Sequence, residues 1–212
     1  MRLFHFLKKQ NGFTTTELMV AVTITSLFGA SFYGAFYTMN TGMWKNNQYF
    51  DTGVSAKIVI EHLAKDVQEA INVETSHGGI NLADACLILK LPSIDANGVP
   101  TNIAAQFDFV TYRINPNDNT QLVRSVDVLG GTSQREGGVD HNDVVVGRKI
   151  SAVLFQAYTG AGGALQGFSS VAAGTVPTLK YIHVRITAQG TTLGTAQQTW
   201  VASDLMLRNH IT

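Results

Sequence analysis

The stretch that decides the fold lies near the N-terminus, where residues 8–22 read KKQNGFTTTELMVAV. A basic leader ends at Gly12, and an aromatic residue and three threonines follow. The single carboxylate of Glu17 then stands at the entrance to an apolar run, with no further charged residue until Lys45. An ionised group at the edge of a bilayer-length segment is costly unless it is paired. We therefore expect Glu17 to have a partner.

The apolar run predicts a membrane-spanning helix. Residues 18–44 contain no Asp, Glu, Lys, Arg or Pro, and a helix of that length reaches about 40 Å at 1.5 Å per residue. Small and hydroxylated residues recur through it, a pattern typical of helices that pack closely against other helices in membranes. The basic residues Arg2, Lys8 and Lys9 precede it and predict a cytoplasmic N-terminus with an exported C-terminal part.

Composition limits the classes of function. The 212 residues suit one domain with an appendage. The chain has 15 basic and 15 acidic residues, and this balance argues against a nucleic-acid partner. Charged residues make up only 14% of the chain, which favours an exported protein. Cys86 is the single cysteine, so an intramolecular disulfide and a cysteine zinc cluster are excluded. We expect Cys86 to be a buried strand residue.

The segment around Gly12, Phe13 and Glu17 resembles the processing signal of type IV pilins and type II secretion pseudopilins. The resemblance implies that a prepilin peptidase cuts after Gly12 and methylates the new terminal Phe13. It also implies that Glu17 is the assembly carboxylate. Residues 14–16 are three threonines, where the family commonly has Thr-Leu-Ile or Ser-Leu-Val, but the spacing is kept.

In such a filament the carboxylate of Glu17 would pair with the terminal ammonium of Phe13 on a neighbouring subunit. Sliding between apolar helices has little positional preference, so one such pair can set the axial register. The alternative is that Glu17 lies in the headgroup region and is hydrated.

Beyond residue 44 the pattern predicts an amphipathic continuation of the helix to residue 72, with a bend or an interruption between about 40 and 53. Apolar residues recur at roughly helical spacing, and charged residues hold the other positions. The apolar set is Ile58, Leu63, Val67, Ala70 and Ile71, and the charged set is Lys57, Glu61, Lys65, Asp66 and Glu69.

From residue 73 short apolar runs alternate with turn residues, which predicts strands. The runs are 86–91, 107–114, 121–126, 144–146, 150–158, 179–187 and 199–207. The second and third should form a hairpin. Segments 93–102, 130–142 and 159–178 are rich in Gly, Asn, Asp and Ala and predict exposed loops.

The predicted fold class is α+β: a long N-terminal helix, apolar in its first half and amphipathic in its second, packed on an antiparallel β-sheet head. The predicted divisions are a leader at 1–12, an apolar transmembrane and assembly helix at 13–44, its continuation at 45–72 and a β-rich head at 73–212. The Tyr112–Arg124 hairpin and the closing residues 207–209 resemble J-class minor pseudopilins and PilW-type minor pilins, which implies a pilin-like fold.

The sequence indicates no catalytic residue. Its six histidines are dispersed with no HExxH pair, and its glycines match no phosphate-binding spacing. We expect no cofactor or metal, with calcium the one candidate. Asp95 with Asn97, and Asp140 with Asp143, could supply oxygen ligands, although neither pair continues to the acidic ligand of an EF-hand and turn chemistry also explains both.

Two tryptophans receive different interpretations. Trp44 follows the apolar run and could anchor at the membrane interface, and we expect Trp200 to lie in the core.

The resemblance therefore implies a minor pilin or pseudopilin that acts in filament assembly, initiation or the tip complex. Its partners would be the prepilin peptidase, other pilins and an assembly platform. It would be held by a single pass in the bacterial inner membrane before it enters a pilus or pseudopilus. One alternative is a membrane-anchored exported binding domain that does not assemble. Another is a secreted hydrolase whose ordinary signal peptide is cleaved near Ala30.

Overall fold

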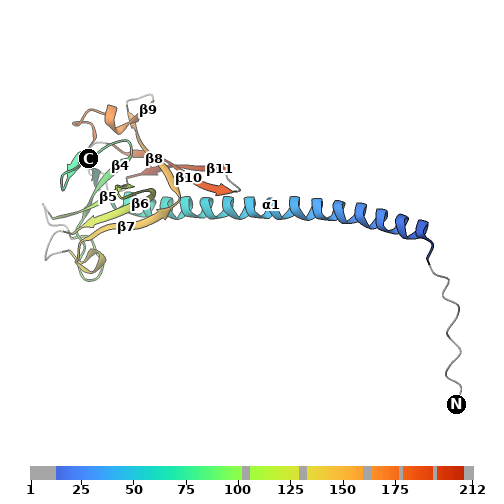
Figure 1. Cartoon of the computed structure of the whole chain (residues 1–212). Coiled ribbons are helices and arrows are strands. Elements are labelled where there is room, and N and C mark those ends of the chain that lie inside the picture. The colour runs from blue at the N-terminus through green and yellow to red at the C-terminus, as the bar shows by residue number, and fades with distance from the viewer. Residues whose placement is uncertain are drawn as a thin grey trace, which may run out of the picture. The chain divides into compact units, whose positions relative to one another are not determined.

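The computed structural model describes residues 13–101, 106–128, 133–159, 164–176, 179–192 and 195–207. The chain divides into two compact units, Met1–Asn46 and Asn47–Thr212. Helix α1 (Thr15–Glu69) supplies the described helical part of the first unit and continues into the second (Figure 1). We call the second unit the head.

Helix α1 runs for 55 residues without a break, so the interruption expected between about 40 and 53 is not found. Thr52, a residue type that often caps a helix start, lies in this stretch. Its hydroxyl instead donates to the carbonyl of Gln48, one turn earlier, at 2.9 Å. A threonine that bonds back in this way stays within a continuing helix, and no proline occurs between residues 13 and 69 to end it.

The C-terminal end of α1 passes directly into a sheet. The amide of Ala70 still donates to the carbonyl of Asp66 at 2.9 Å, whereas the next amide, that of Ile71, donates to Lys90 at 2.8 Å. The helix therefore ends where pairing with strand β4 takes over from the helical bonds.

The first sheet of the head has five antiparallel strands in the order β1-β4-β5-β6-β7. The strands are β1 (Asn72–Val73), β4 (Cys86–Pro92), β5 (Phe107–Asn115), β6 (Asp118–Asp127) and β7 (His141–Arg148). The predicted hairpin is confirmed, because β5 pairs with β6 from Phe109↔Asp127 to Asn115↔Asp118. A small two-stranded sheet, β2 (Ser76–His77) with β3 (Ile80–Asn81), lies between β1 and β4 in the sequence.

The second sheet has four antiparallel strands in the order β11-β10-β8-β9. They are β8 (Ile150–Thr159), β9 (Ala164–Gly167), β10 (Tyr181–Thr192) and β11 (Thr195–Met206). Two short 3-10 helices, η1 (Arg135–Gly137) and η2 (Phe168–Ser170), complete the described elements. The prediction that 159–178 is entirely loop was wrong, because β9 and η2 lie within it. The chain crosses between the sheets at Lys149, which has a positive φ of 60°.

The core of the head lies between α1 and both sheets. The helix contributes a fully buried stripe of Ala56, Val59, Leu63 and Val67, and the buried Ala70, directly after the helix, extends it. These positions follow the 3.6-residue period. Two assignments to the faces of the helix were wrong: Ile58, expected in the core, is 43% exposed, and Asp66, expected at the surface, is only 4% exposed. Ile58 precedes Leu63 by five residues, a spacing that turns the two away from each other.

One glycine in each sheet lies where α1 approaches the strand closely. A Cβ atom at Gly147 of β7 would lie 2.4 Å from Cγ2 of Val59, and one at Gly190 of β10 would lie 2.6 Å from Oε1 of Gln48. Both contacts are shorter than atoms tolerate. At β7 the helix can therefore pack this closely only because position 147 has no side chain, whereas at position 190 the close atom is the end of the flexible Gln48 side chain.

The expectation for Cys86 is confirmed, since it is a buried residue of β4. Burial raises the pKa of its thiol from 9.0 to about 11. The expectation for Trp200 was wrong, because its side chain is 61% exposed on β11. The coarse fold class is confirmed as α+β: one long N-terminal helix packed on antiparallel sheets.

Candidate functional site

The first candidate site is the start of α1. Thr14 and Glu17 form a capping box, in which the amide and the hydroxyl of Thr14 donate to Oε2 of Glu17 at 3.0 and 2.9 Å. The amide of Glu17 donates in return to the hydroxyl of Thr14 at 3.2 Å. This reciprocal pairing satisfies donors that a helix start otherwise leaves open. The run of threonines before Glu17 thus has a local structural role.

The capping box uses only one of the two carboxylate oxygens of Glu17. No hydrogen bond within the described ranges reaches Oε1. Phe13, which precedes the helix, has 85% of its surface exposed. Gly12, the other predicted cleavage-site residue, lies outside the described residues. A carboxylate can accept several donors, so Glu17 can cap its own helix and also accept a donor from another molecule.

The first half of α1 presents large apolar side chains to the surroundings. Eleven large apolar residues from Leu18 to Trp44 show this exposure, each with at least 49% of its surface accessible: Leu18, Met19, Val20, Val22, Ile24, Leu27, Phe28, Phe32, Phe36, Met39 and Trp44. The helix is long and apolar enough to cross a membrane. A soluble monomer seldom exposes so large an apolar surface, so this segment needs lipid or other helices to cover it.

Six serine and threonine hydroxyls of this half-helix donate hydrogen bonds to backbone carbonyls of the same helix. Thr23 donates to the carbonyl of Met19 at 2.8 Å, and Ser26 donates to that of Val22 at 2.7 Å. The same four-residue return occurs at Thr25, Ser31, Thr38 and Thr41. A hydroxyl that bonds back into its own helix presents no unpaired donor to an apolar environment. These six hydroxyls therefore do not prevent insertion into a bilayer.

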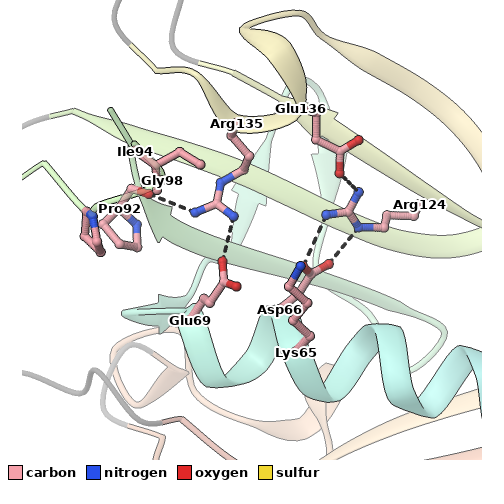
Figure 2. Close-up of a pocket in the computed structure, with 10 residues that line it drawn as sticks. Lys65, Asp66, Glu69, Pro92, Ile94, Gly98, Arg124, Arg135 and Glu136 are labelled. Atoms are coloured by element: carbon pink, nitrogen blue, oxygen red, sulfur yellow. Dashed lines mark hydrogen bonds and ion pairs between the residues drawn. The ribbon is translucent and has the colours of Figure 1, made fainter. Parts of the chain in front are cut away.

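The second candidate site is a charged pocket of about 430 Å³ in the head (Figure 2). It lies where the end of α1 meets β6 and parts of two segments that the sequence predicted to be loops, 93–102 and 130–142. Its walls combine charged groups with apolar ring and alkyl groups. The lining residues are Lys65, Asp66, Glu69, Pro92, Ile94, Gly98, Pro100, Arg124, Arg135 and Glu136.

Asp66 forms the centre of one half of the pocket. Its carboxylate accepts the hydroxyl of Tyr112 at 2.5 Å, and it accepts Nε and Nη2 of Arg124 at 2.7 and 3.2 Å. Burial, and then the charge of Asp66, raises the pKa of the Tyr112 hydroxyl above its ordinary value. Burial lowers the pKa of Arg124, but the hydrogen bonds and charge of Asp66 outweigh it and raise that pKa overall. Arg124 also contacts Glu136 through Nη1. Asp66 and Arg124 are therefore held as an ion pair.

Arg135 forms the centre of the other half, and its side chain is only 8% exposed. Its Nε donates to the fully buried Asp108 at 3.0 Å, Nη1 donates to Glu69 at 2.7 Å, and Nη2 donates to the carbonyl of Pro92 at 3.0 Å. Ser133 donates to the same oxygen of Asp108 at 2.7 Å. One arginine thus joins the end of α1, strand β5 and the end of strand β4 to its own surface segment.

The geometry of this pocket indicates a structural clamp. Each arginine donates to two carboxylates of the chain itself, and Arg124 holds both oxygens of Asp66 in the fork arrangement that guanidinium groups favour. Removing one partner of such a buried set leaves a charge uncompensated. The clamp therefore fixes how strands β4, β5 and β6 and the segment that carries Arg135 and Glu136 lie against the end of the helix.

The weak calcium candidates are engaged in protein contacts. Oδ1 of Asp95 accepts the amides of Asn97 and Val99 at 2.9 and 2.8 Å, which closes a turn. Asp140 accepts the amide of Val128 at 2.8 Å. Asp143 accepts Nη2 of Arg113 at 3.1 Å. Within the described ranges no three His, Cys, Asp or Glu side chains lie close enough together to hold a metal ion.

The sequence analysis missed the clamp. Asp66 lies three residues after Leu63 and next to Val67, so its position on the buried stripe was a usable signal. Arg135 lies in a segment read as exposed loop, and no local pattern distinguishes an arginine that folds back into the core. Comparison with known proteins adds no family assignment, because no family model, no curated protein and no solved structure matches the chain.

Proposed function

We propose that this chain is a minor pilin-like subunit of a type IV pilus or type II secretion pseudopilus, made as a membrane precursor and processed after Gly12. The observation that carries the proposal is the exposed apolar half of α1, which begins at the capping box of Thr14 and Glu17 and is followed in the sequence by a compact head. A lone anchor needs only apolar length. A carboxylate at the first turn, with one oxygen that no hydrogen bond from the described residues reaches, suits a segment that also pairs with a neighbour.

In this proposal the segment is first held in the inner membrane, with the N-terminus in the cytoplasm and the head exported. A prepilin peptidase removes the leader and methylates Phe13. The ammonium of Phe13 on one subunit then pairs with Glu17 of the next, which sets the stagger between helices. The subunit acts in assembly, initiation or capping of the filament and performs no reaction of its own.

The first experiment is to determine the mature N-terminus by mass spectrometry of protein taken from membranes and sheared filaments of the native host. N-methyl-Phe13 is the expected terminus. An intact Met1 would instead indicate a static anchor for an exported binding domain. A start near Ser31 would indicate ordinary secretion and contradict the proposal.

The capping box allows a sharper test of Glu17. Glutamine can replace glutamate in a capping box but has no charge. If Glu17 pairs with an ammonium between subunits, Glu17→Gln should lose incorporation into filaments as completely as Glu17→Ala. The matched control is Thr14→Ala, which weakens the cap by about 1 kcal/mol and keeps the carboxylate, so it should still be incorporated. Normal incorporation of Glu17→Gln would show that Glu17 acts only as a cap.

A further inference from the structure

The two large sheets of the head have four edges, and three of them are short or irregular. β1 has two residues and β9 has four. β7 has eight, but its register with β6 shifts between Leu122 and Val123 and again between Arg124 and Val126. Short strands and bulges are the means by which proteins prevent unwanted strand pairing at sheet edges.

The fourth edge, β11, has no such protection. It pairs with β10 over twelve consecutive residue pairs, from Tyr181↔Met206 to Thr192↔Thr195, without a register shift. Its sequence, TAQQTWVASDLM, contains no Lys, Arg, Pro or Gly. No strand among the described elements pairs with its other side. β11 therefore presents a long, regular row of backbone donors and acceptors of the kind that accepts an added strand.

Burial across the sheet indicates that an outer strand is lacking. On β10 the core-facing residues Ile182, Val184 and Ile186 are fully buried. On the same face of β11, Leu205 is buried, but Val201 and Ser203 keep intermediate exposure. One more strand beside β11 would cover them as β11 covers its neighbour.

The outer face beside this edge has the composition of a protein contact surface. Trp200 is 61% exposed and Met206 is 53% exposed. The guanidinium of Arg185, on β10, lies 5.2 Å from the centre of the Trp200 ring. Strands β8, β10 and β11 contain no Lys or Glu. Interfaces are enriched in Trp, Met and Arg and depleted in Lys and Glu.

Asp204 places one negative charge in this surface. It lies on the same face of β11 as Trp200 and Met206, since side chains alternate along a strand, and its side chain is 57% exposed. Its Oδ1 lies 2.7 Å from Nδ1 of His183 and accepts the hydroxyl of Tyr158 at 2.8 Å. The hydrogen bond from His183, followed by that from Tyr158, lowers the pKa of Asp204. A strand added beside β11 would gain from a cation opposite this carboxylate.

We propose that β11 accepts an extended segment of another polypeptide as an additional antiparallel strand. Read from its N-terminus, that segment has an apolar residue opposite Met206. Two residues later it has a Lys or Arg opposite Asp204. Four residues after that it has an apolar residue opposite Trp200. A second copy of β11 does not fit, because residues 195–206 contain no basic residue. The inference rests on the head alone and does not depend on processing after Gly12.

The test uses the full chain in membranes of its native host, with the photo-crosslinking residue p-benzoylphenylalanine placed singly at Gln198 or Ala202 of β11. Gln189, exposed on the same face of the interior strand β10, is the matched control position. After irradiation, the crosslinked residues are located by tandem mass spectrometry. We expect both β11 positions to reach one polypeptide segment, at residues four apart and in reversed order. We expect no such adduct from Gln189.

Charge reversal gives the second measurement. Asp204→Lys should lower the crosslinking yield from Ala202 at least tenfold, and Asp204→Asn should lower it several-fold. Glu61→Lys, a reversal at an exposed site on α1, should leave the yield unchanged. Protection of the buried Cys86 from a thiol reagent shows that each variant is folded. The proposal is overturned by adducts only to lipid, by adducts to another copy of this chain, by partner residues that do not reverse in order, or by equal yields from Gln189.

Discussion

Substitution of Gly147 by alanine tests the close packing of α1 on the first sheet. The new Cβ would lie 2.4 Å from Cγ2 of Val59 and 3.1 Å from Cγ1 of Ile150. Carbon atoms normally approach to about 3.5–4.0 Å, so the first contact is short by more than about 1 Å. Val59 is fully buried, and a valine in a helix has essentially one rotamer, so it cannot turn aside.

The expected loss of stability follows from two opposing terms. Overpacking of a core costs about 1–3 kcal/mol, whereas replacing glycine restricts the unfolded chain and returns about 0.4–1 kcal/mol. Gly147→Ala should therefore destabilise the head by about 1–2 kcal/mol. With a urea dependence of about 2 kcal/mol per molar, the unfolding midpoint should fall by about 0.5–1 M.

The assay uses Cys86 as its reporter, because it is the single cysteine and is buried in β4. The full chain in nonionic micelles is equilibrated in urea, exposed briefly to a thiol reagent and analysed by mass spectrometry. The labelled fraction then reports unfolding of the head.

The decisive comparison adds Val59→Ala. That change alone should cost about 2 kcal/mol through the cavity it leaves, but the double variant should be at least 1 kcal/mol more stable than the sum of the single losses predicts. Gly53→Ala is the control, because a Cβ there meets no atom within 4 Å and alanine favours the helix by about 0.5–1 kcal/mol. An unchanged midpoint for Gly147→Ala, or strict additivity in the double variant, would refute the reasoning.

Three further expectations concern other residues of the head. Arg135→Met should cost about 3–5 kcal/mol because it leaves the buried Asp108 without its cation, and adding Asp108→Asn should restore part of the loss in urea titrations. The raised pKa of Cys86 means that at alkaline pH the unfolded thiol ionises before the folded one. The free energy of unfolding should therefore fall as pH rises from about 9 towards 11, and it should fall less in Cys86→Ala when unfolding is followed by circular dichroism. Trp200→Ala should change stability by less than about 0.5 kcal/mol, since the ring is exposed, whereas Phe155→Ala, at a fully buried site, should cost about 3–5 kcal/mol.

The sequence predicted those parts of the fold that depend on local pattern. The apolar run from Leu18 and the hairpin between Ile114 and Leu122 follow from charge spacing and turn residues, and both are found in the structure. The capping box was also readable, because Thr14 and Glu17 have the required spacing, although that spacing was interpreted only as part of a processing signal.

The rest depends on contacts between residues far apart in the chain. Arg135 and Glu69 are 66 residues apart, and only the folded sheets bring them together. Trp200 is on an edge strand with an open face, and an apolar side chain in a strand does not reveal on its own whether its face will be covered. The close approach at Gly147 was equally hidden, since a glycine in a β-pattern gives no sign of which helix lies above it.

The hydroxyl groups that return to the backbone of α1 have a consequence for how this helix can be moved. Thr23, Ser26 and Thr38 each hold their hydrogen bond inside one turn of their own helix. No such bond has to be broken when the surroundings change from acyl chains to protein side chains. For these hydroxyls, the free energy of transfer from acyl chains to protein side chains would therefore depend mainly on shape complementarity and contact area. These hydroxyls would keep the same hydrogen bonds before and after the transfer.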